Sequence, residues 1–343
     1  MRAMKQRAFL AVLAVGLLTL SACGHREGPK AGQLKLGMVT DVGGLGDHSF
    51  NDSANAGLVR AKDQLDAYTQ VLQSRSAADY QPNLTALTNQ KFDMIYAIGF
   101  LMSKDLDQIA KQNPSQHYAI IDAVVDDPNV VSVTFNEQDG SFLAGALAAM
   151  MSKTHHVAFL GGMDIPLLRK FEAGYTAGVH EIDPTAKVDV KYANSFEDAA
   201  TGKELANVLY NSGVDVIYAA AGKAGLGAID AVKTRPAGTY VIGVDSDQDD
   251  LAPGKILTSM VKHVDVAVYR SAQAMKSGKP LTGHVTLGLK DQAIGLTDFK
   301  YTKDVIGPER INRLNTIQLA IENGRIVVPY TREALATFKP VKM

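Results

Sequence analysis

The stretch "TDVGGLGDHSFNDSANAGL", from Thr40 to Leu58, follows the apolar run "LKLGMV" and precedes a segment with helical periodicity. The expected turn between a first strand and a first helix is therefore rich in glycine, carboxylate and hydroxyl groups. Glycines let the backbone approach a bound molecule closely, and the free N–H groups at a helix start attract polar ligand atoms. This stretch predicts a binding site at the carboxyl end of the first strand.

Short apolar runs alternate with amphipathic segments along the rest of the chain. The first group of expected strands is "LKLGMVT", "YTQVLQS", "DMIYAIG", "HYAIID" and "VVSVTF", and the second is "HHVAFLGG", "KVDVKYA", "VDVIYAAA", "TYVIGVD" and "ILTSMV". Strands that alternate with helices form parallel sheets covered on both faces. The two groups predict an α/β protein with two doubly wound lobes. Its ligand would lie between the lobes, at the carboxyl ends of both sheets. The later strands "HVTLGLK" and "AIGLTDF" either extend the second lobe or return to the first.

The N-terminus is typical of an export signal. A basic start, "MRAMKQR", is followed by thirteen non-polar or weakly polar residues, "AFLAVLAVGLLTL", and by the small residues "SACG". A helix needs roughly 20 apolar residues to cross a bilayer, so this run is too short to span one. Residues 1–22 are predicted to be a signal peptide. Cys23, the one cysteine of the chain, ends "LSAC", which resembles the lipobox of bacterial lipoproteins and implies a lipidated cysteine. Residues 23–33 would then be a polar, flexible tether.

Composition excludes several classes of function. The 343 residues are 46% hydrophobic and carry a formal net charge of −1, without a basic helix or a run of basic residues, so nucleic acid is not an expected partner. The sequence holds no P-loop, no H-E-x-x-H and no G-x-S-x-G motif. We therefore expect no catalytic set, no metal site and no cofactor.

Polar residues recur where expected strands end. Asp41, Asp122 and Asp245 each follow a strand, and Lys262 closes "ILTSMVK". Any one of these residues has an equally good structural interpretation as a helix cap or a turn residue. Together they suit a polyol such as ribose, because buried carboxylates need hydroxyl or N–H donors. Lys262 would donate to the same sugar and balance the acids.

The expected helix start adds an aromatic ring to these polar groups. Phe50 lies beside Asp47, Ser49 and Asn51, which favours a ring stacked on a flat ligand, with Asn51 reading the edge of a base. Ser49 is expected to cap the helix. For the opposite wall the candidates are Phe171 and Tyr218, although Tyr218 lies in the middle of an expected strand and is alternatively a core residue. Gly222, which follows "VIYAAA", is a further candidate at a strand end.

The residues quoted so far, with "AIIDAVVDDPNVVSVTFNEQDGSFLAGALAAMMSK", "VAFLGGMDIPLLRKFEAGYTAGV", "VIGVDSDQ" and "TSMVKHVDVAVY", resemble the basic membrane protein family of lipoproteins. This family includes purine nucleoside receptors of bacterial ABC importers. The resemblance implies the type I periplasmic-binding-protein fold, with two Rossmann-like lobes joined by three crossings. Residues 34–134 plus about 263–285 would form the N-terminal lobe, and 135–262 plus about 286–343 the C-terminal lobe.

By this resemblance the chain is a monomeric, extracytoplasmic, lipid-anchored binding protein, and not an enzyme. It would deliver a nucleoside to a permease driven by an ATPase. Asp41 and Asn51 match positions that address the base and Phe50 matches a stacking ring. Asp122, Asp245 and Lys262 match positions that bind the ribose.

Other functions remain open at this point. Within the binding class, the ligand is alternatively a sugar, an autoinducer or riboflavin, and the chain is alternatively a sensor or adhesin. A nucleoside-acting enzyme would need a tight aspartate cluster for calcium, which the sequence lacks. Repressors that share the fold carry a helix-turn-helix where this chain has its export signal.

Overall fold

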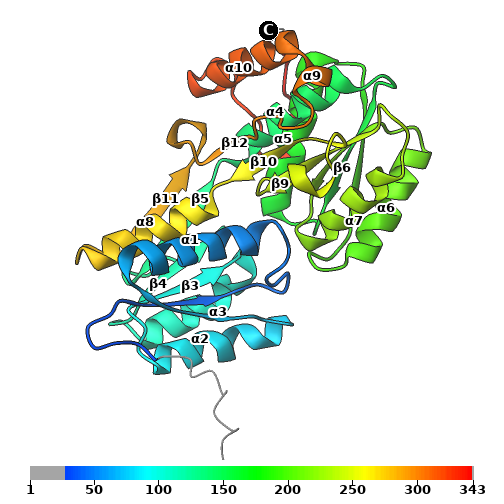
Figure 1. Cartoon of the computed structure of the whole chain (residues 1–343). Coiled ribbons are helices and arrows are strands. Elements are labelled where there is room, and N and C mark those ends of the chain that lie inside the picture. The colour runs from blue at the N-terminus through cyan, green and yellow to red at the C-terminus, as the bar shows by residue number, and fades with distance from the viewer. Residues whose placement is uncertain (1–27, 342–343) are drawn as a thin grey trace, which may run out of the picture.

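The computed structural model describes residues 28–341, which form two lobes, each built on one six-stranded sheet (Figure 1). The predicted signal peptide and Cys23 lie outside the described residues. Within those residues, no helix has the length and apolar character that crossing a membrane requires. The prediction of an α/β protein with two doubly wound lobes is confirmed.

The first lobe is a parallel sheet with a helical layer on each face. Helices α1 (Phe50–Leu65) and α8 (Val264–Lys276) pack on one face, and α2 (Tyr80–Asn89) and α3 (Ser103–Gln112) on the other. Burial on both faces explains why these strands are apolar without alternation. In spatial order the strands are β11 (Gly283–Leu287), β5 (Val130–Phe135), β4 (His117–Ile121), β3 (Met94–Ile98), β1 (Lys35–Val39) and β2 (Tyr68–Leu72).

The second lobe repeats this plan and adds an antiparallel edge. Its helical layers are α4 (Glu137–Met151) with α5 (Pro166–Ile182), and α6 (Ala199–Asn211) with α7 (Lys223–Lys233). The strands, in spatial order, are β12 (Ile294–Leu296), β10 (Ile256–Lys262), β9 (Tyr240–Asp245), β8 (Val216–Ala220), β6 (His156–Gly161) and β7 (Lys187–Tyr192), with β12 antiparallel to β10.

The C-terminal segment covers the second lobe. After the short helix α9 (Lys303–Ile306), α10 (Pro308–Glu322) packs on α4, and α11 (Arg332–Ala336) packs on α5. Figure 1 shows α9 and α10, drawn in orange and red, at the end of the molecule that is distant from the first lobe.

In its described part, the chain crosses between the lobes after β5, after β10 and after β11. The first crossing leads from Phe135 through Asn136 into α4, and the second leads from Lys262 through His263 into α8. The third returns at Gly288, and the amide of Asn136 donates to Leu287 O over 2.9 Å, which holds the first and third crossings side by side. These crossings form the hinge.

Helix α5 lies unusually close to α4, and this sets the position of its first turns at the cleft. A Cβ atom added to Gly178 would stand 2.0 Å from the carbonyl oxygen of Phe142. The two backbones therefore approach more closely than any side chain would allow. Ridge-into-groove contact of this kind fixes the direction in which α5 points toward the other lobe.

Candidate functional site

A cleft between the lobes contains about 540 Å³ of space, part of it open to solvent. Its walls come from the carboxyl ends of strands in both sheets and from the first turns of α1 and α5. The lining residues are Asp41, Gly43, Asp47, Phe50, Asn51, Gly99, Phe100, Asp122, Leu167, Leu168, Phe171, Phe196, Ala220, Gly222, Val244, Asp245 and Lys262.

The loop between β1 and α1, which contains Asp41 and Asp47, forms one wall of this cleft together with Asn51, and these side chains are hydrogen-bonded to one another. Asn51 Nδ2 donates to Asp41 Oδ1 over 2.8 Å and to Asp47 Oδ2 over 3.0 Å. Burial raises the pKa of Asp41 to about 6, although the hydrogen bonds from Asn51 and from the Gly43 amide favour the charged form. Burial likewise raises the pKa of Asp47. These side chains are thus rigid before any ligand arrives.

The start of α1 is capped by Asp47, which corrects the expectation that Ser49 caps it. Asp47 accepts from the backbone amides of Ser49, Asn51 and Asp52 over 2.8 to 3.1 Å. The Ser49 hydroxyl makes no capping bond and instead donates to Asp245 Oδ2 in the second lobe over 2.6 Å. Ser49 does not line the cleft, so its role is to orient a carboxylate that does.

Lys262, Asp122 and Asp245 form the polar wall of the cleft. Lys262 lies between the two carboxylates, and its side chain is 3% exposed. Its ammonium donates to Asp122 Oδ2 over 2.6 Å and lies 3.8 Å from Asp245 Oδ1. Burial disfavours the charged ammonium, but the carboxylates of Asp122, Asp245 and Glu137 outweigh this and raise the pKa of Lys262. Burial raises the pKa of Asp245 to about 6, against the opposing effect of Lys262. The structure thus brings together the residues that the sequence predicted for a sugar.

Both aspartates of this group have left-handed backbone geometry, with φ of 69° at Asp122 and 65° at Asp245. Aspartate and asparagine tolerate this region better than alanine or branched residues do. Strained backbone of this kind concentrates at ligand sites. Asparagine is therefore the replacement that removes the charge and keeps the local backbone.

Two hydrogen-bond acceptors of the cleft are buried and have no hydrogen-bond partner among residues 28–341. They are Asn51 Oδ1 and Asp122 Oδ1, one on each side of the polar wall. A buried acceptor without a partner is costly, and native proteins usually pair it with a protein group or water, so an exception at a cleft points to a bound group. These atoms suit a ligand that donates N–H or O–H groups at two places.

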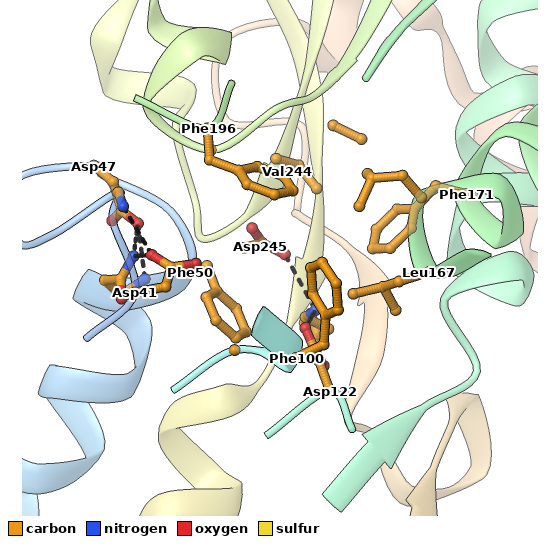
Figure 2. A pocket seen from close by; sticks show the side chains of 17 residues that line it. Asp41, Asp47, Phe50, Phe100, Asp122, Leu167, Phe171, Phe196, Val244 and Asp245 are labelled. Atoms are coloured by element: carbon orange, nitrogen blue, oxygen red, sulfur yellow. Dashed lines mark hydrogen bonds and ion pairs between the residues drawn. The ribbon is translucent and has the colours of Figure 1, made fainter. Parts of the chain in front are cut away.

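Aromatic rings form a further part of the wall, together with apolar side chains such as Leu167 and Val244 (Figure 2). Phe50 belongs to the first lobe, and its ring centroid lies 4.7 Å from the Lys262 ammonium. Phe171 enters from α5, as predicted for the opposite wall. Sequence reasoning missed Phe100, which follows β3, and Phe196, which follows β7. Phe100 stands directly after an expected strand, so the rule that found the aspartates would also have found its ring, whereas Phe196 stands three residues beyond the run "KVDVKYA" and nothing local marks it.

The prediction that Tyr218 faces the ligand is wrong. This residue is fully buried in the middle of β8 and does not line the cleft. Its ring packs against Phe159 and Tyr175 with centroids 5.8 and 5.4 Å away, and its hydroxyl lies 3.3 Å from that of Ser141. A mid-strand side chain points into the face of the sheet, not beyond its end.

Gly222 lines the cleft at the start of α7, as predicted. Its φ of 55° and ψ of −133° lie in a region that side chains avoid, and an added Cβ would stand 3.3 Å from Phe196 O. Glycine here lets the turn hold the Phe196 segment against the cleft.

Among the described residues, no group of three or more histidine, cysteine, aspartate or glutamate side chains is arranged to hold a metal ion.

Comparisons with known proteins identify the family and the fold. The model of the Bmp family, described as ABC transporter substrate-binding protein PnrA-like, matches residues 34–332. The chain is 38% identical to a CD4+ T-cell-stimulating antigen of Listeria innocua and 35% identical to the ABC transporter nucleoside-binding protein BmpA of Lactococcus lactis. Each match covers 95% of this chain and 99% of the relative. A solute-binding protein of an ABC transporter from Aeropyrum pernix K1 superposes with a TM-score of 0.82 at 29% identity, covering 88% of this chain and 95% of that one.

Proposed function

The chain belongs to the Bmp family of PnrA-like ABC transporter substrate-binding proteins, and from this premise we propose that it captures a nucleoside between its lobes for an ABC importer. Purine nucleosides are the first candidates. A relative that is 35% identical bears the name of a nucleoside-binding protein, and this supports the ligand class.

The observation that carries the proposal is the pairing of aromatic rings with unpartnered acceptors in one cleft. Phe50 and Phe196 offer flat apolar surfaces from opposite lobes. Asn51 Oδ1 would accept an N–H of the base, and Asp122 Oδ1 a hydroxyl of the ribose. Asp245 and Lys262 would complete the sugar site. A free sugar would leave the rings unused, and a free base would leave the carboxylates unused.

Capture requires no covalent chemistry. In this proposal the nucleoside binds one lobe first, and closure about the hinge then removes water from its hydroxyl groups and stacks its base. The closed form is the species that the permease recognises. Energy for transport comes from the ATPase of the importer, because the sequence of this chain contains no P-loop.

We further propose that the chain is a monomer anchored outside the cytoplasm through a lipid on Cys23. The residues concerned lie outside the described range, so the proposal rests on the "LSAC" sequence and on the polar tether after it. Relatives named basic membrane protein support it. Mass spectrometry of the chain recovered from its own host should find acyl groups on Cys23, and Cys23→Ala should release the protein from the membrane fraction.

Calorimetric titration tests the ligand directly. The full-length chain, freed of co-purified ligand by unfolding and refolding, is titrated with adenosine, guanosine, inosine, uridine, ribose and riboflavin. We expect tight one-to-one binding of at least one nucleoside and no heat from ribose. Binding of ribose or riboflavin with silence from every nucleoside would contradict the proposed ligand and leave the fold unaffected. Release of ribose from inosine during the titration would instead identify a nucleoside-acting enzyme.

A further inference from the structure

Glu137 is a fully buried carboxylate that the proposed nucleoside site does not use. It is the first residue of α4, directly after the first hinge crossing, and it does not line the cleft. Its Oε2 accepts from Lys170 Nζ of α5 over 3.3 Å. Its Oε1 has no hydrogen-bond partner among the described residues and lies 4.0 Å from Lys262 Nζ. The Glu137 side chain thus connects the start of α4, at the hinge, with Lys262 of the polar wall without lining the cleft itself.

Lys262 also stands at a hinge crossing, since it ends β10 one residue before His263 leads into α8. Its ammonium is therefore shared by carboxylates from three places. Asp122 belongs to the first lobe, Asp245 belongs to the second, and Glu137 belongs to the hinge. Asp122 and Asp245 line the cleft, so ligand hydroxyls that bind them can shift their carboxylates relative to Lys262, whereas Glu137 does not line the cleft.

We infer that Glu137 is a positioning residue that holds the Lys262 ammonium in place while a ligand occupies Asp122 and Asp245. This inference rests on the proposed function, because it assumes that those two carboxylates receive ligand hydroxyls. A buried ammonium that loses its partners is strongly destabilised. Glu137 supplies a counter-charge whose position does not depend on the ligand, and the shape of the sugar site thereby depends on a residue that does not line the cleft.

The charges around Glu137 make this support dependent on pH. The groups that face it are Lys262 from β10, Lys170 from α5, Asp122 after β4 and the Tyr218 hydroxyl from β8. Burial raises the pKa of Glu137 to about 7, although Lys262 and Lys170 favour its charged form. Glu137 is therefore ionised above pH 7 and neutral well below it. Lys262 should be held most firmly on the alkaline side.

The test compares Glu137→Gln with the unaltered full-length chain, with inosine as the probe, at pH 5.5 and pH 8. Glutamine resembles protonated glutamate, so the two proteins should differ only where Glu137 is charged. At pH 8 we expect the variant to bind inosine about tenfold more weakly, because a buried charge loses its partner. At pH 5.5 the difference in inosine affinity between the two proteins should fall below about twofold. The affinity for the free base hypoxanthine should be the same in both proteins at each pH value.

Asp139→Asn is the matched control. Asp139 lies on the same first turn of α4, and burial raises its pKa to about 6, but it does not line the cleft. This variant should bind inosine like the unaltered chain at both pH values. The inference would be overturned if the ratio of inosine affinities between the unaltered chain and Glu137→Gln were the same at pH 5.5 and pH 8. If Glu137→Gln does not fold, Glu137→Asp keeps the charge at greater distance and should show a smaller loss with the same pH dependence.

A measurement without ligand separates this inference from the proposed function. The probe is the side-chain ammonium resonance of Lys262 in a chain labelled with ¹⁵N-lysine, assigned with Lys262→Gln. As pH changes, this resonance should shift with a midpoint near 7, because burial raises the pKa of Glu137 to about 7. In Glu137→Gln the component with that midpoint should be absent, and only the shift caused by Asp245, whose pKa burial raises to about 6, should remain. If inosine fails to bind and the shift is seen, the proposed ligand is wrong and the coupling of Glu137 to Lys262 holds. If the shift is missing from the unaltered chain, the coupling itself is refuted.

Discussion

Asp41 is a residue whose charge changes within an accessible pH range. Burial raises its pKa to about 6, so the unliganded chain carries a protonated Asp41 below that pH and a carboxylate above it. If the carboxylate accepts an N–H of the base, binding must favour ionisation. We therefore expect nucleoside affinity to fall as pH drops through 6, and Asp41→Asn to remove that part of the dependence. Calorimetry of both proteins between pH 5 and pH 8 measures this.

The direction in which nucleoside affinity changes with pH tests the role assigned to Asp41. A base that accepts a hydrogen bond from protonated Asp41 would instead bind more tightly below pH 6. That result would reverse the role assigned to Asp41 while leaving it in the site. An identical profile in Asp41→Asn would remove Asp41 from base recognition altogether.

The rings of Phe50 and Phe196 provide a second prediction at the scale of residues. Stacking of a base on an aromatic side chain contributes roughly 1–3 kcal/mol, so Phe50→Ala and Phe196→Ala should each weaken nucleoside binding by about that amount. Ribose, which lacks a flat ring and is expected to give no heat with the unaltered chain, should give none with either variant. The measurement is the dissociation constant of each variant for the tightest nucleoside.

Tyr218→Phe is the matched control for these rings. It removes only a hydroxyl whose neighbour is Ser141 in the core, so it should leave nucleoside affinity unchanged. A loss of affinity in Tyr218→Phe equal to that in Phe196→Ala would restore the sequence-based assignment that the structure contradicts.

The contrast between Tyr218 and Phe196 shows what sequence reasoning can achieve for single residues. Asp41, Asp122 and Asp245 were found because each follows an apolar run, and the end of a parallel strand is where a cleft forms. Tyr218 was misassigned because an aromatic residue inside such a run belongs to the face of the sheet. Phe196 follows the weaker run "KVDVKYA", and nothing local marks it, because the opposite lobe that makes it useful is distant in sequence.

At the scale of elements, the close contact of α4 and α5 sets the position of one wall of the cleft. Gly178→Ala would place a Cβ atom 2.0 Å from Phe142 O, and backbone must move to relieve the overlap. We expect a loss of stability of about 1–3 kcal/mol, in the range of an overpacked core. Because α5 carries Phe171 into the cleft, nucleoside affinity should fall as well. Denaturant unfolding and calorimetry measure the two effects.

Gly295→Ala is the control for this helix contact. Gly295 lies in β12, and no heavy atom stands within 4 Å of its hypothetical Cβ atom. Its substitution should change stability by no more than about 0.5 kcal/mol. Equal losses in the two variants would mean that glycine flexibility, and not the helix contact, sets the cost.

The elements themselves were the most predictable level of this protein. Each run expected to be a strand is a strand. The central parallel strands are buried on both faces, which requires continuous apolar sequence, whereas the edge strands β2, β7 and β11 are partly or largely exposed. The antiparallel direction of β12 was not predictable. Its three residues carry no periodicity, and their direction is set by the third crossing, which is a long-range feature.

At the scale of the whole molecule, the two lobes touch directly across the cleft. Gln248 Nε2 donates to His48 O over 2.9 Å, and Ser246 Oγ donates to Ser49 O over 2.9 Å. Gln248→Leu removes the first of these contacts and should lower the population of the closed form. We expect the radius of gyration of the ligand-free variant to exceed that of the unaltered chain in small-angle scattering. Saturating nucleoside should abolish the difference, with affinity reduced about 3–10-fold.

Asp247→Asn serves as the neighbouring control. The Asp247 carboxylate accepts a hydrogen bond from the Asp249 amide within the second lobe. Among residues 28–341 it makes no hydrogen bond across the cleft. Its substitution should leave both the radius of gyration and the affinity unchanged. Equal expansion in both variants would assign the effect to the loop and not to the contact between lobes.

The three crossings also impose an order on biosynthesis. The ribosome completes β1 to β5 early, but helix α8 and the edge strand β11 of that same sheet are made only after the central part of the second lobe. Until residue 276 has been synthesised, the first lobe lacks helix α8, which packs against α1. Until residue 287 it leaves β5 as an open edge, while the second lobe already has five of its strands. An unprotected edge strand invites pairing with other chains. The nascent protein therefore depends longest on chaperones for the half that was translated first.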